Sequence, residues 1–195
     1  GTFTYAHNEI VEMDEPKYKW AYQYKAGHPI NSINCLIADG LYKDEEEIAS
    51  SPKSVYATRY PLQPGDIKYR DLNNDDIIDD NDKCRTGNPT VPEIIYGFGF
   101  SLKYKGFDCS AFFQGQGKVS IIMYDAHPFS AKAKPGFGLV QWIADEHWSE
   151  SNPDPAAKYP RLSSQWNEHN GQANTLYVRN GKMLRLKTVE IGYCL

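Results

Sequence analysis

Residues 94–116 read IIYGFGFSLKYKGFDCSAFFQGQ, and this stretch decides the fold. Large apolar residues alternate strictly with small or polar residues over 96–104, which is the pattern of a β-strand with two unlike faces. A second alternating run covers 107–116, with Phe112 as a large apolar residue on its polar face. The two runs are joined by Lys105-Gly106, which suits a two-residue hairpin turn because glycine adopts a positive φ without strain. The sequence therefore predicts an antiparallel hairpin with strands at 94–104 and 107–116.

Two further alternating runs lie near the ends of the chain, at residues 1–8 and 183–195. In the last run the apolar residues Leu186 and Val189 are three positions apart and would lie on opposite faces of a regular strand. We therefore expect a β-bulge or bend near Lys187-Thr188. Each run has one apolar or aromatic face and one small or polar face. The predicted fold class is all-β, with about four long antiparallel strands.

Long irregular segments, 9–93 and 117–174, separate these strands. Connections of this length are uncommon in compact domains and are usually functional where they occur. In the first segment Asp44 has the character of a helix N-cap, with a carboxylate three residues later. In the second, apolar residues at helical spacing predict a helix within 139–147. A short run at 177–179 precedes an Asn-Gly turn signal and is expected to extend the last strand as a small hairpin.

Composition excludes several functional classes. The 195 residues include 21 Lys and Arg against 25 Asp and Glu, which gives a net charge of −4 and a pI near 5.7. Nucleic acid is therefore not an expected partner, because phosphate binding needs a basic surface. No segment approaches the roughly 18 consecutive apolar residues of a membrane-spanning helix, whereas strands that cross a membrane leave no such peak.

Residues of the types that carry catalysis do not form a recognisable pattern. The five histidines have no metal-binding spacing, and no nucleophile elbow, P-loop or dinucleotide fingerprint is found. We therefore expect no enzymatic activity.

The four cysteines are widely spread and are expected to be unlinked small hydrophobic residues: Cys35, Cys84, Cys109 and Cys194. Four aromatic residues suit either stacking on a sugar ring or packing of the loop helices onto the sheet: Trp142, Trp148, Trp166 and Tyr177.

The segment from Asp71 to Asp82 has the spacing of a calcium-binding loop. Calcium prefers six to eight oxygen ligands, which an EF-hand loop supplies from positions 1, 3, 5, 7, 9 and 12. The corresponding residues are Asp71, Asn73, Asp75, Ile77 through its backbone carbonyl, Asp79 and Asp82. Asp76 stands where the turn normally has glycine, and Asp82 is shorter than the usual glutamate. The alternatives are a structural Ca²⁺ site, which we favour, and a solvated acidic turn.

The strand pattern alone does not choose between two environments. A soluble antiparallel sheet with one solvated face shows the same alternation as a membrane barrel, and the pattern by itself favours the soluble sheet. A soluble calcium-stabilised β module that binds glycans or proteins is therefore one functional hypothesis.

A set of motifs spread along nearly the whole chain resembles the late barrel region of SusC/RagA-type TonB-dependent receptors. The motifs are GDIKYRDLNNDDIIDDND at 65–82, GNP at 87–89, YGFG at 96–99, YKGFD at 104–108, FFQG at 112–115, WSESNP at 148–153, YPRL at 159–162 and LRLKTVEIGY at 184–193. In this family the positions of Asn74 and Asp76 are commonly glycine, which is a departure in the acidic loop.

The resemblance implies that the chain is a fragment of an outer-membrane importer of oligosaccharides or peptides in a Gram-negative bacterium. It implies a transmembrane β-barrel segment in contact with outer-membrane lipid, in which 9–93 and 117–174 are extracellular loops. It also implies three partners: a SusD/RagB-like surface lipoprotein, the TonB system acting through a plug outside this segment, and the transported ligand.

The resemblance further assigns the two faces of the strands. Lipid-facing residues would be Phe98, Phe100, Leu102, Cys109, Ala111, Phe113, Ile191 and Tyr193. Lumen-facing residues would be Gly97, Gly99, Ser101, Asp108, Ser110 and Glu190.

Overall fold

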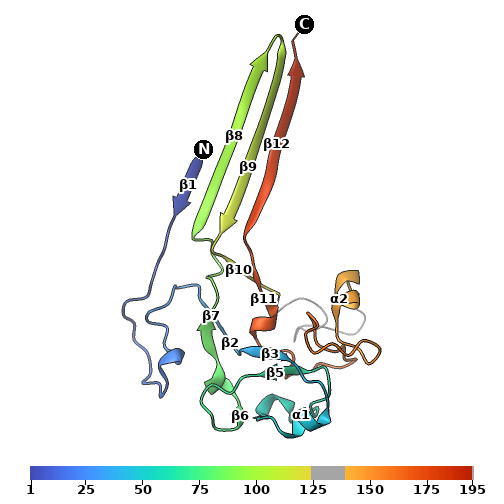
Figure 1. Ribbon diagram of the computed structural model, residues 1–195. Coiled ribbons are helices and arrows are strands. Elements are labelled where there is room, and N and C mark those ends of the chain that lie inside the picture. Colours follow the sequence, from blue (N-terminus) through green and yellow to red (C-terminus); the bar gives the residue numbers. More distant parts are fainter. Residues whose placement is uncertain (124–138, 195) are drawn as a thin grey trace.

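The computed structural model describes residues 1–123 and 139–194 of the chain. A long sheet stands at one end of the molecule, and the two long connections fold together at the other end (Figure 1). Part of the predicted second loop, 124–138, and the last residue of the predicted final strand, Leu195, lie outside the described residues. Among the described helices, none has the length and apolar character needed to cross a membrane.

Four antiparallel strands form the long sheet, in the order β1-β8-β9-β12. Their bounds are β1 Thr2–Tyr5, β8 Ile94–Tyr104, β9 Phe107–Gly117 and β12 Met183–Tyr193. The predicted hairpin is present, and its turn residues Lys105 and Gly106 have φ of 46° and 83°, as a tight hairpin turn requires. The all-β fold class with four antiparallel strands is confirmed, and the strands form an open sheet in this segment.

The pairing register separates two faces over the whole sheet. Phe98 lies opposite Phe113, which in turn lies opposite Leu186. On the other face Ser101 lies opposite Ser110, which pairs with Glu190. The register shifts between Leu186 and Thr188, so the predicted bulge is confirmed; it restores Val189 to the apolar face.

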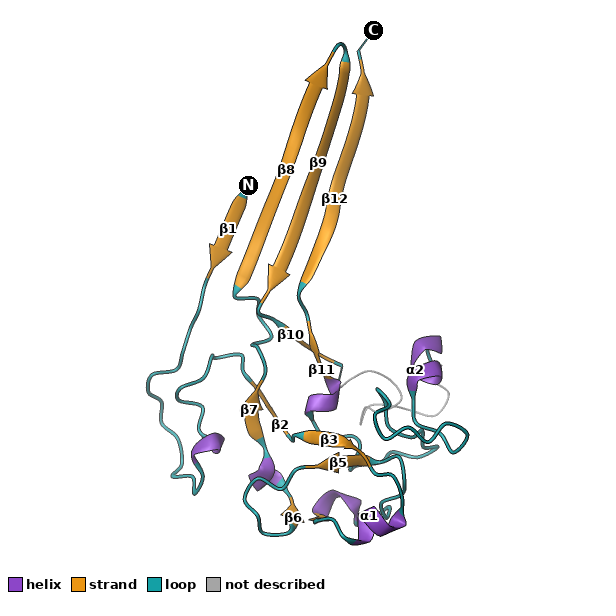
Figure 2. Ribbon diagram, viewed as in Figure 1, coloured by secondary structure: helices purple, strands orange, loops and turns teal. Residues whose placement is uncertain are grey.

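The two long connections contain short strands and helices, which Figure 2 shows gathered below the sheet. The first connection holds the elements η1 Ala21–Gln23, β2 Ile33–Cys35, β3 Ala38–Leu41, α1 Glu45–Ala49, β4 Lys53–Ser54, η2 Val55–Ala57, β5 Ile67–Tyr69, β6 Ile77–Ile78, η3 Asp80–Asp82 and β7 Cys84–Thr86. The second holds β10 Ser120–Ile122, α2 Gln141–Glu146, η4 Thr175–Tyr177 and β11 Val178–Asn180. Two-stranded pairs form between β2 and β7, β3 and β5, β4 and β6, and β10 and β11.

One predicted pairing is wrong. The run at 177–179 was expected to pair with the last strand, but β11 pairs antiparallel with β10, with Ile121 opposite Arg179. The chain continues from β11 into β12 through Asn180-Gly181 without folding back as a hairpin. β11 pairs with β10 instead of with β12, which follows it directly in the chain. The pairing continues beyond the strands, where Met123 donates its backbone N–H to the carbonyl oxygen of Tyr177 at 2.8 Å.

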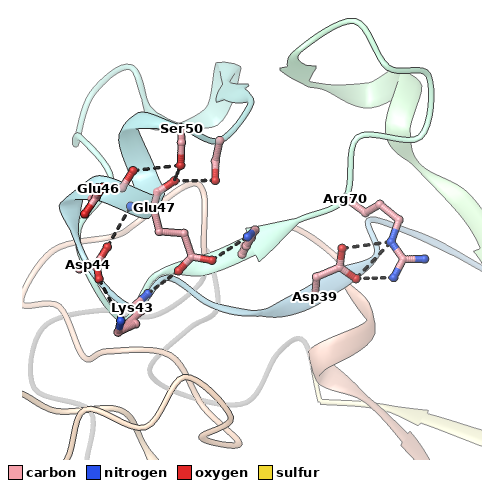
Figure 3. A network of polar contacts seen from close by, with 9 residues as sticks. Asp39, Lys43, Asp44, Glu46, Glu47, Ser50 and Arg70 are labelled. Carbon is pink, nitrogen blue, oxygen red and sulfur yellow. Dashed lines mark hydrogen bonds and ion pairs between the residues drawn. The ribbon is translucent and has the colours of Figure 1, made fainter.

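The predicted helix at Asp44 is confirmed. Asp44 accepts the backbone N–H of Glu47 at 2.9 Å, and Glu47 in turn accepts that of Lys43 at 2.8 Å (Figure 3). Two ion pairs connect this helix and the neighbouring strands: Glu47 of α1 pairs with Lys68 on β5 at 2.6 Å, and Arg70 just after β5 pairs with Asp39 on β3 at 2.5 Å. The helix expected within 139–147 is also present as α2.

The hydrophobic core lies entirely in the connections. Its buried residues are Leu36, Leu41, Ile67, Tyr69, Ile78, Ile143, Trp148, Tyr159 and Tyr177. The first five belong to the first connection and the last four to the second, so the two segments bury a common core. We call residues 33–86 together with 141–180 the loop unit. The four strands of the long sheet contribute no residue to this core, because a single open sheet has no second layer against which to bury either face.

Candidate functional site

The apolar face of the long sheet is exposed. Phe98, Leu102 and Ile191 are 46%, 63% and 79% accessible, although the rings of Phe98 and Phe113 stack at 5.1 Å. Every residue that the resemblance assigned to lipid lies on this face by register. A contiguous exposed apolar surface of this kind marks contact with a membrane or another protein.

The opposite face is polar and carries a single large ring. Ser110 donates to the Glu190 carboxylate at 3.3 Å, and the residues assigned to the lumen all lie on this side. The ring of Phe112 lies over Gly97 and Gly99, since a Cβ at either glycine would come within 3.1 Å of it. The glycines of β8 are therefore needed as a flat platform on which this aromatic ring packs.

A charged cluster joins the sheet to the first connection. Glu93 is nearly buried and contacts His7 at 2.5 Å (Oε1 to Nδ1) and Lys118 at 3.6 Å. The hydrogen bond from His7, followed by the charges of His7 and Lys118, holds the pKa of Glu93 below its usual range. The three residues come from the chain after β1, before β8 and after β9, so they fix where the sheet ends and the loops begin.

In the acidic segment Asp71 organises the turn. Its Oδ1 accepts the backbone N–H groups of Asn73 and Asn74 at 3.1 and 2.6 Å, and its Oδ2 accepts that of Asp76 at 2.8 Å. Asn74 and Asp76 have φ of 58° and 62°, the left-handed region that glycine would occupy without strain. Asn and Asp adopt this conformation more readily than other residues with a side chain, so the turn forms without glycine at either position.

The second half of the segment closes on Asp82. Asp82 is fully buried and accepts the backbone N–H groups of Leu72 at 2.8 Å and Asp79 at 2.9 Å. Burial, together with the Asp71 and Asp79 carboxylates, raises the pKa of Asp82. Ile78 is buried in the core and anchors the loop.

The six expected calcium ligands therefore belong to one closed loop. Several of their oxygen atoms accept hydrogen bonds within it, and in the described part of the chain no group of three His, Cys, Asp or Glu side chains is arranged to hold a metal ion. Calcium binding by these residues stays a prediction.

A buried polar cluster, which the sequence analysis did not find, ties the two connections together. Asp66 of the first connection is 1% exposed and is paired with Arg161 at 2.7 Å. The same carboxylate accepts from the amides of Asn167 at 3.1 Å and Asn170 at 2.8 Å. These partners lie about a hundred residues away in the chain, so no local pattern could reveal them.

His169 completes this cluster. Its ring contacts Ser54 Oγ at 2.8 Å through Nδ1 and the carbonyl oxygen of Ile67 at 2.6 Å through Nε2. Burial lowers the pKa of His169, so the ring is neutral at ordinary pH. Because a carbonyl oxygen can only accept, Nε2 carries the single N–H of the neutral ring and donates it to Ile67, while Nδ1 accepts from the Ser54 hydroxyl.

A half-open cavity of about 710 Å³ lies where the two connections meet. It is lined by Glu45, Gln63, Pro64, His147, Trp148, Ser149, Glu150, Arg161 and Leu162. Trp148 supplies an aromatic wall and packs against Gly65, where a Cβ would come within 2.3 Å of its ring. Of the aromatic residues considered for sugar stacking, Trp148 and Tyr177 are buried, whereas Trp142 remains 43% exposed.

The fold and its surfaces define a class of protein: a strand-built wall with one apolar and one polar face, carrying large folded loops at one end. Comparisons with known proteins name the family. The chain is 35% identical over 156 residues to TonB-dependent receptor P26 of Formosa agariphila, and 29% identical over 159 residues to TonB-dependent receptor P3 of the same organism. These matches cover 79% and 78% of this chain and 14% of each relative, so the chain spans about a seventh of their length.

The fold agrees with this relationship. A solved structure of the RagAB peptide importer in the open-open state matches 95% of this chain and 18% of its own, with a TM-score of 0.56 and 21% identity. No protein-family model matches the chain. The predicted resemblance is confirmed: the chain belongs to the TonB-dependent receptors, and its fold matches that found in the RagAB importer.

Proposed function

We propose that this chain forms part of the barrel wall and of the outward loops of an outer-membrane importer for oligosaccharides or peptides in a Gram-negative bacterium. The proposal rests mainly on one observation. The loop unit buries a hydrophobic core, whereas the long sheet contributes no residue to any core and leaves its apolar face exposed. Strands that leave an apolar face exposed while the loops bury a common core suit a wall whose outer face contacts lipid. The names of the relatives, which are receptors and not enzymes, support a binding and transport role.

The partners follow from the same proposal. A SusD/RagB-like surface lipoprotein would dock on the loop unit, and the TonB system would act through a plug domain of the same receptor. The match in fold to the RagAB peptide importer in its open-open state supports this arrangement. In the loop unit, the cavity lined by Trp148 offers an aromatic wall with the carboxylates of Glu45 and Glu150, which suits a polar organic ligand.

The experiment compares two single substitutions in the full-length receptor. Phe98→Asp places a charge on the apolar face, and Ser101→Asp places the same charge on the polar face. We expect Phe98→Asp to reduce the amount of receptor in the outer-membrane fraction severalfold, because a charged side chain that faces lipid destabilises the barrel, although Asp costs less than the roughly 2–4 kcal/mol of Lys or Arg at the bilayer midplane. Ser101→Asp is expected to insert as the parent does. Equal insertion of both variants would contradict the proposal and favour the soluble glycan- or protein-binding module.

The substrate class requires a separate measurement. Calorimetric titration of the receptor with neutral oligosaccharides and with basic peptides distinguishes the two. If peptides are the ligands of the cavity, Glu150→Gln should weaken peptide binding about tenfold at low salt, because a carboxylate that pairs with a cation is lost. Binding of oligosaccharides alone, unaffected by this substitution, would assign the sugars.

A further inference from the structure

Two of the cysteines face each other across a pair of strands. β2 and β7 are antiparallel, with Ile33 opposite Thr86 and Cys35 opposite Cys84. Directly opposed residues of antiparallel strands place their side chains on the same face, with Cα atoms about 4.5–5.5 Å apart. A disulfide spans Cα separations of about 4.4–6.8 Å, so this register satisfies its geometric requirement.

Both thiols are held in the interior. Cys35 is fully buried and Cys84 is 8% exposed. Burial raises the pKa of Cys35 to about 12, with a further contribution from Cys84, and burial also raises the pKa of Cys84. Because only a thiolate attacks a disulfide or binds a metal, these cysteines are unreactive once the loop unit has folded. We therefore expect a covalent link between them to form while the chain is folding.

The other two cysteines have no such partner. Cys109 on β9 lies between Leu102 and Ile191, and Cys194 follows β12 at the exposed end of the sheet. All four positions are thiols in the structure. Only one pairing is therefore compatible with the register.

We propose that Cys35 and Cys84 are joined by a disulfide in the mature receptor. The proposal rests on the proposed function for one point, which is that the loop unit matures outside the cytoplasm, where disulfides persist. The link closes the chain from 35 to 84, which contains α1, the acidic loop and half of the core. It stabilises the loop unit by restricting the unfolded chain.

The reaction is a thiol–disulfide exchange with a dithiol oxidase or a small-molecule disulfide as the oxidant. The thiolate of one cysteine attacks a sulfur of the oxidant, which gives a mixed disulfide and releases one thiolate of the oxidant. The second cysteine then attacks the mixed disulfide, so that the Cys35–Cys84 bond forms and the second oxidant thiolate leaves. Two electrons pass to the oxidant, and the two protons lost by the cysteines convert its thiolates to thiols.

The test is mass spectrometry of the full-length receptor, extracted from membranes in acid, denatured and alkylated without reduction. We expect one cross-linked peptide pair that contains Cys35 and Cys84, while Cys109 and Cys194 carry the alkyl group. Reduction before alkylation should separate the pair and modify all four. Alkylation of Cys35 and Cys84 in the unreduced sample would overturn the proposal.

Variants show whether the link stabilises the loops. The double change Cys35→Ala and Cys84→Ala is expected to raise the rate of loop proteolysis about tenfold or more, because the link is lost. Reduction of the parent receptor should give the same fast rate. Cys109→Ala, the control, should be cleaved as slowly as the oxidised parent. Free thiols in a receptor that is inserted normally would refute the disulfide itself. If the thiols are free and neither the parent nor the Ser101→Asp receptor reaches the outer membrane, the result would contradict the proposed outer-membrane location of the receptor.

Discussion

At the scale of single residues, Asp71 has the greatest effect on the acidic loop. Its carboxylate receives three backbone N–H groups and draws the turn around the other oxygen-bearing side chains. Burial, and to a lesser extent repulsion from Asp71 and Asp79, raises the pKa of Asp82. If calcium binds there, as we propose, it would offset this repulsion among the three carboxylates. A ligand that binds only the native state stabilises it by about 2.7 kcal/mol at a hundred times its dissociation constant.

We therefore expect millimolar calcium to raise the melting temperature of the loop unit relative to a chelator. Asp71→Asn should remove this shift, because it takes a charged ligand from position 1 while keeping an acceptor for the backbone. Asp39→Asn, a carboxylate outside the loop, is the control. Identical melting in calcium and chelator, with no heat of binding, would leave the segment as a solvated acidic turn.

His169 gives the loop unit a dependence on pH. Its buried ring is neutral in the folded state because desolvation lowers its pKa. The unfolded chain, with an ordinary histidine pKa near 6.5, binds a proton at higher pH than the folded chain does. Stability therefore falls as the pH drops below about 6.5, since protons then favour the unfolded state.

Hydrogen exchange of the loop amides between pH 7 and pH 5.5, corrected for intrinsic rates, measures this effect. Protection should decrease toward low pH in the parent. His169→Gln, which retains groups that can donate and accept, should flatten the slope even though it lowers the overall protection. A slope that survives in the variant would show that other groups are responsible.

At the scale of elements, the hairpin of β8 and β9 depends on close backbone approach. A Cβ at Gly99 would lie 2.6 Å from the carbonyl oxygen of Ala111, which cannot move without disturbing the ladder. At Gly117 a Cβ would meet Ile94 at 3.7 Å, which is an ordinary contact. We expect Gly99→Ala to destabilise the barrel by about 1–3 kcal/mol and Gly117→Ala to have little effect.

Unfolding of the receptor in denaturant, followed by the shift between folded and unfolded forms on gels, provides the measurement. The two alanine variants differ only in position, so any effect of the added methyl group on strand propensity is common to both. Equal midpoints would mean that the sheet accommodates the clash by a local bulge.

At the scale of the whole molecule, the loop unit is built from two distant segments that bury one common core, so we expect it to unfold as a single cooperative unit. Ile67 is fully buried in the core of the first connection, and the core residues of the second pack into the same cluster. Ile67→Ala should cost about 2–5 kcal/mol. Because the core is shared, the loss should also expose the second connection.

Limited proteolysis with identification of the cut sites tests this coupling. In Ile67→Ala, cleavage within 141–180 should accelerate while the strands of the long sheet stay protected. Val55→Ala, in the same connection but 46% exposed, is the matched control. Faster cleavage confined to the first connection would show that the two segments fold independently.

Elements formed between neighbours in the chain could be predicted from the sequence. The hairpin at 94–117, its turn, the bulge at Lys187 and the cap of α1 all follow from alternation and turn chemistry within a few residues. The pairing of β11 with β10 could not be predicted, because a turn signal shows where the chain bends and not which strand it meets.

The sequence by itself determined the two-faced strands and the family, because a period of two and a series of local motifs are both written in neighbouring residues. The tertiary structure alone decided the rest: the shared core, the Asp66 cluster that joins Arg161 and Asn170, and the opposition of Cys35 to Cys84. These contacts join positions that are about 50 to 100 residues apart, and burial rather than any repeating pattern brings them together.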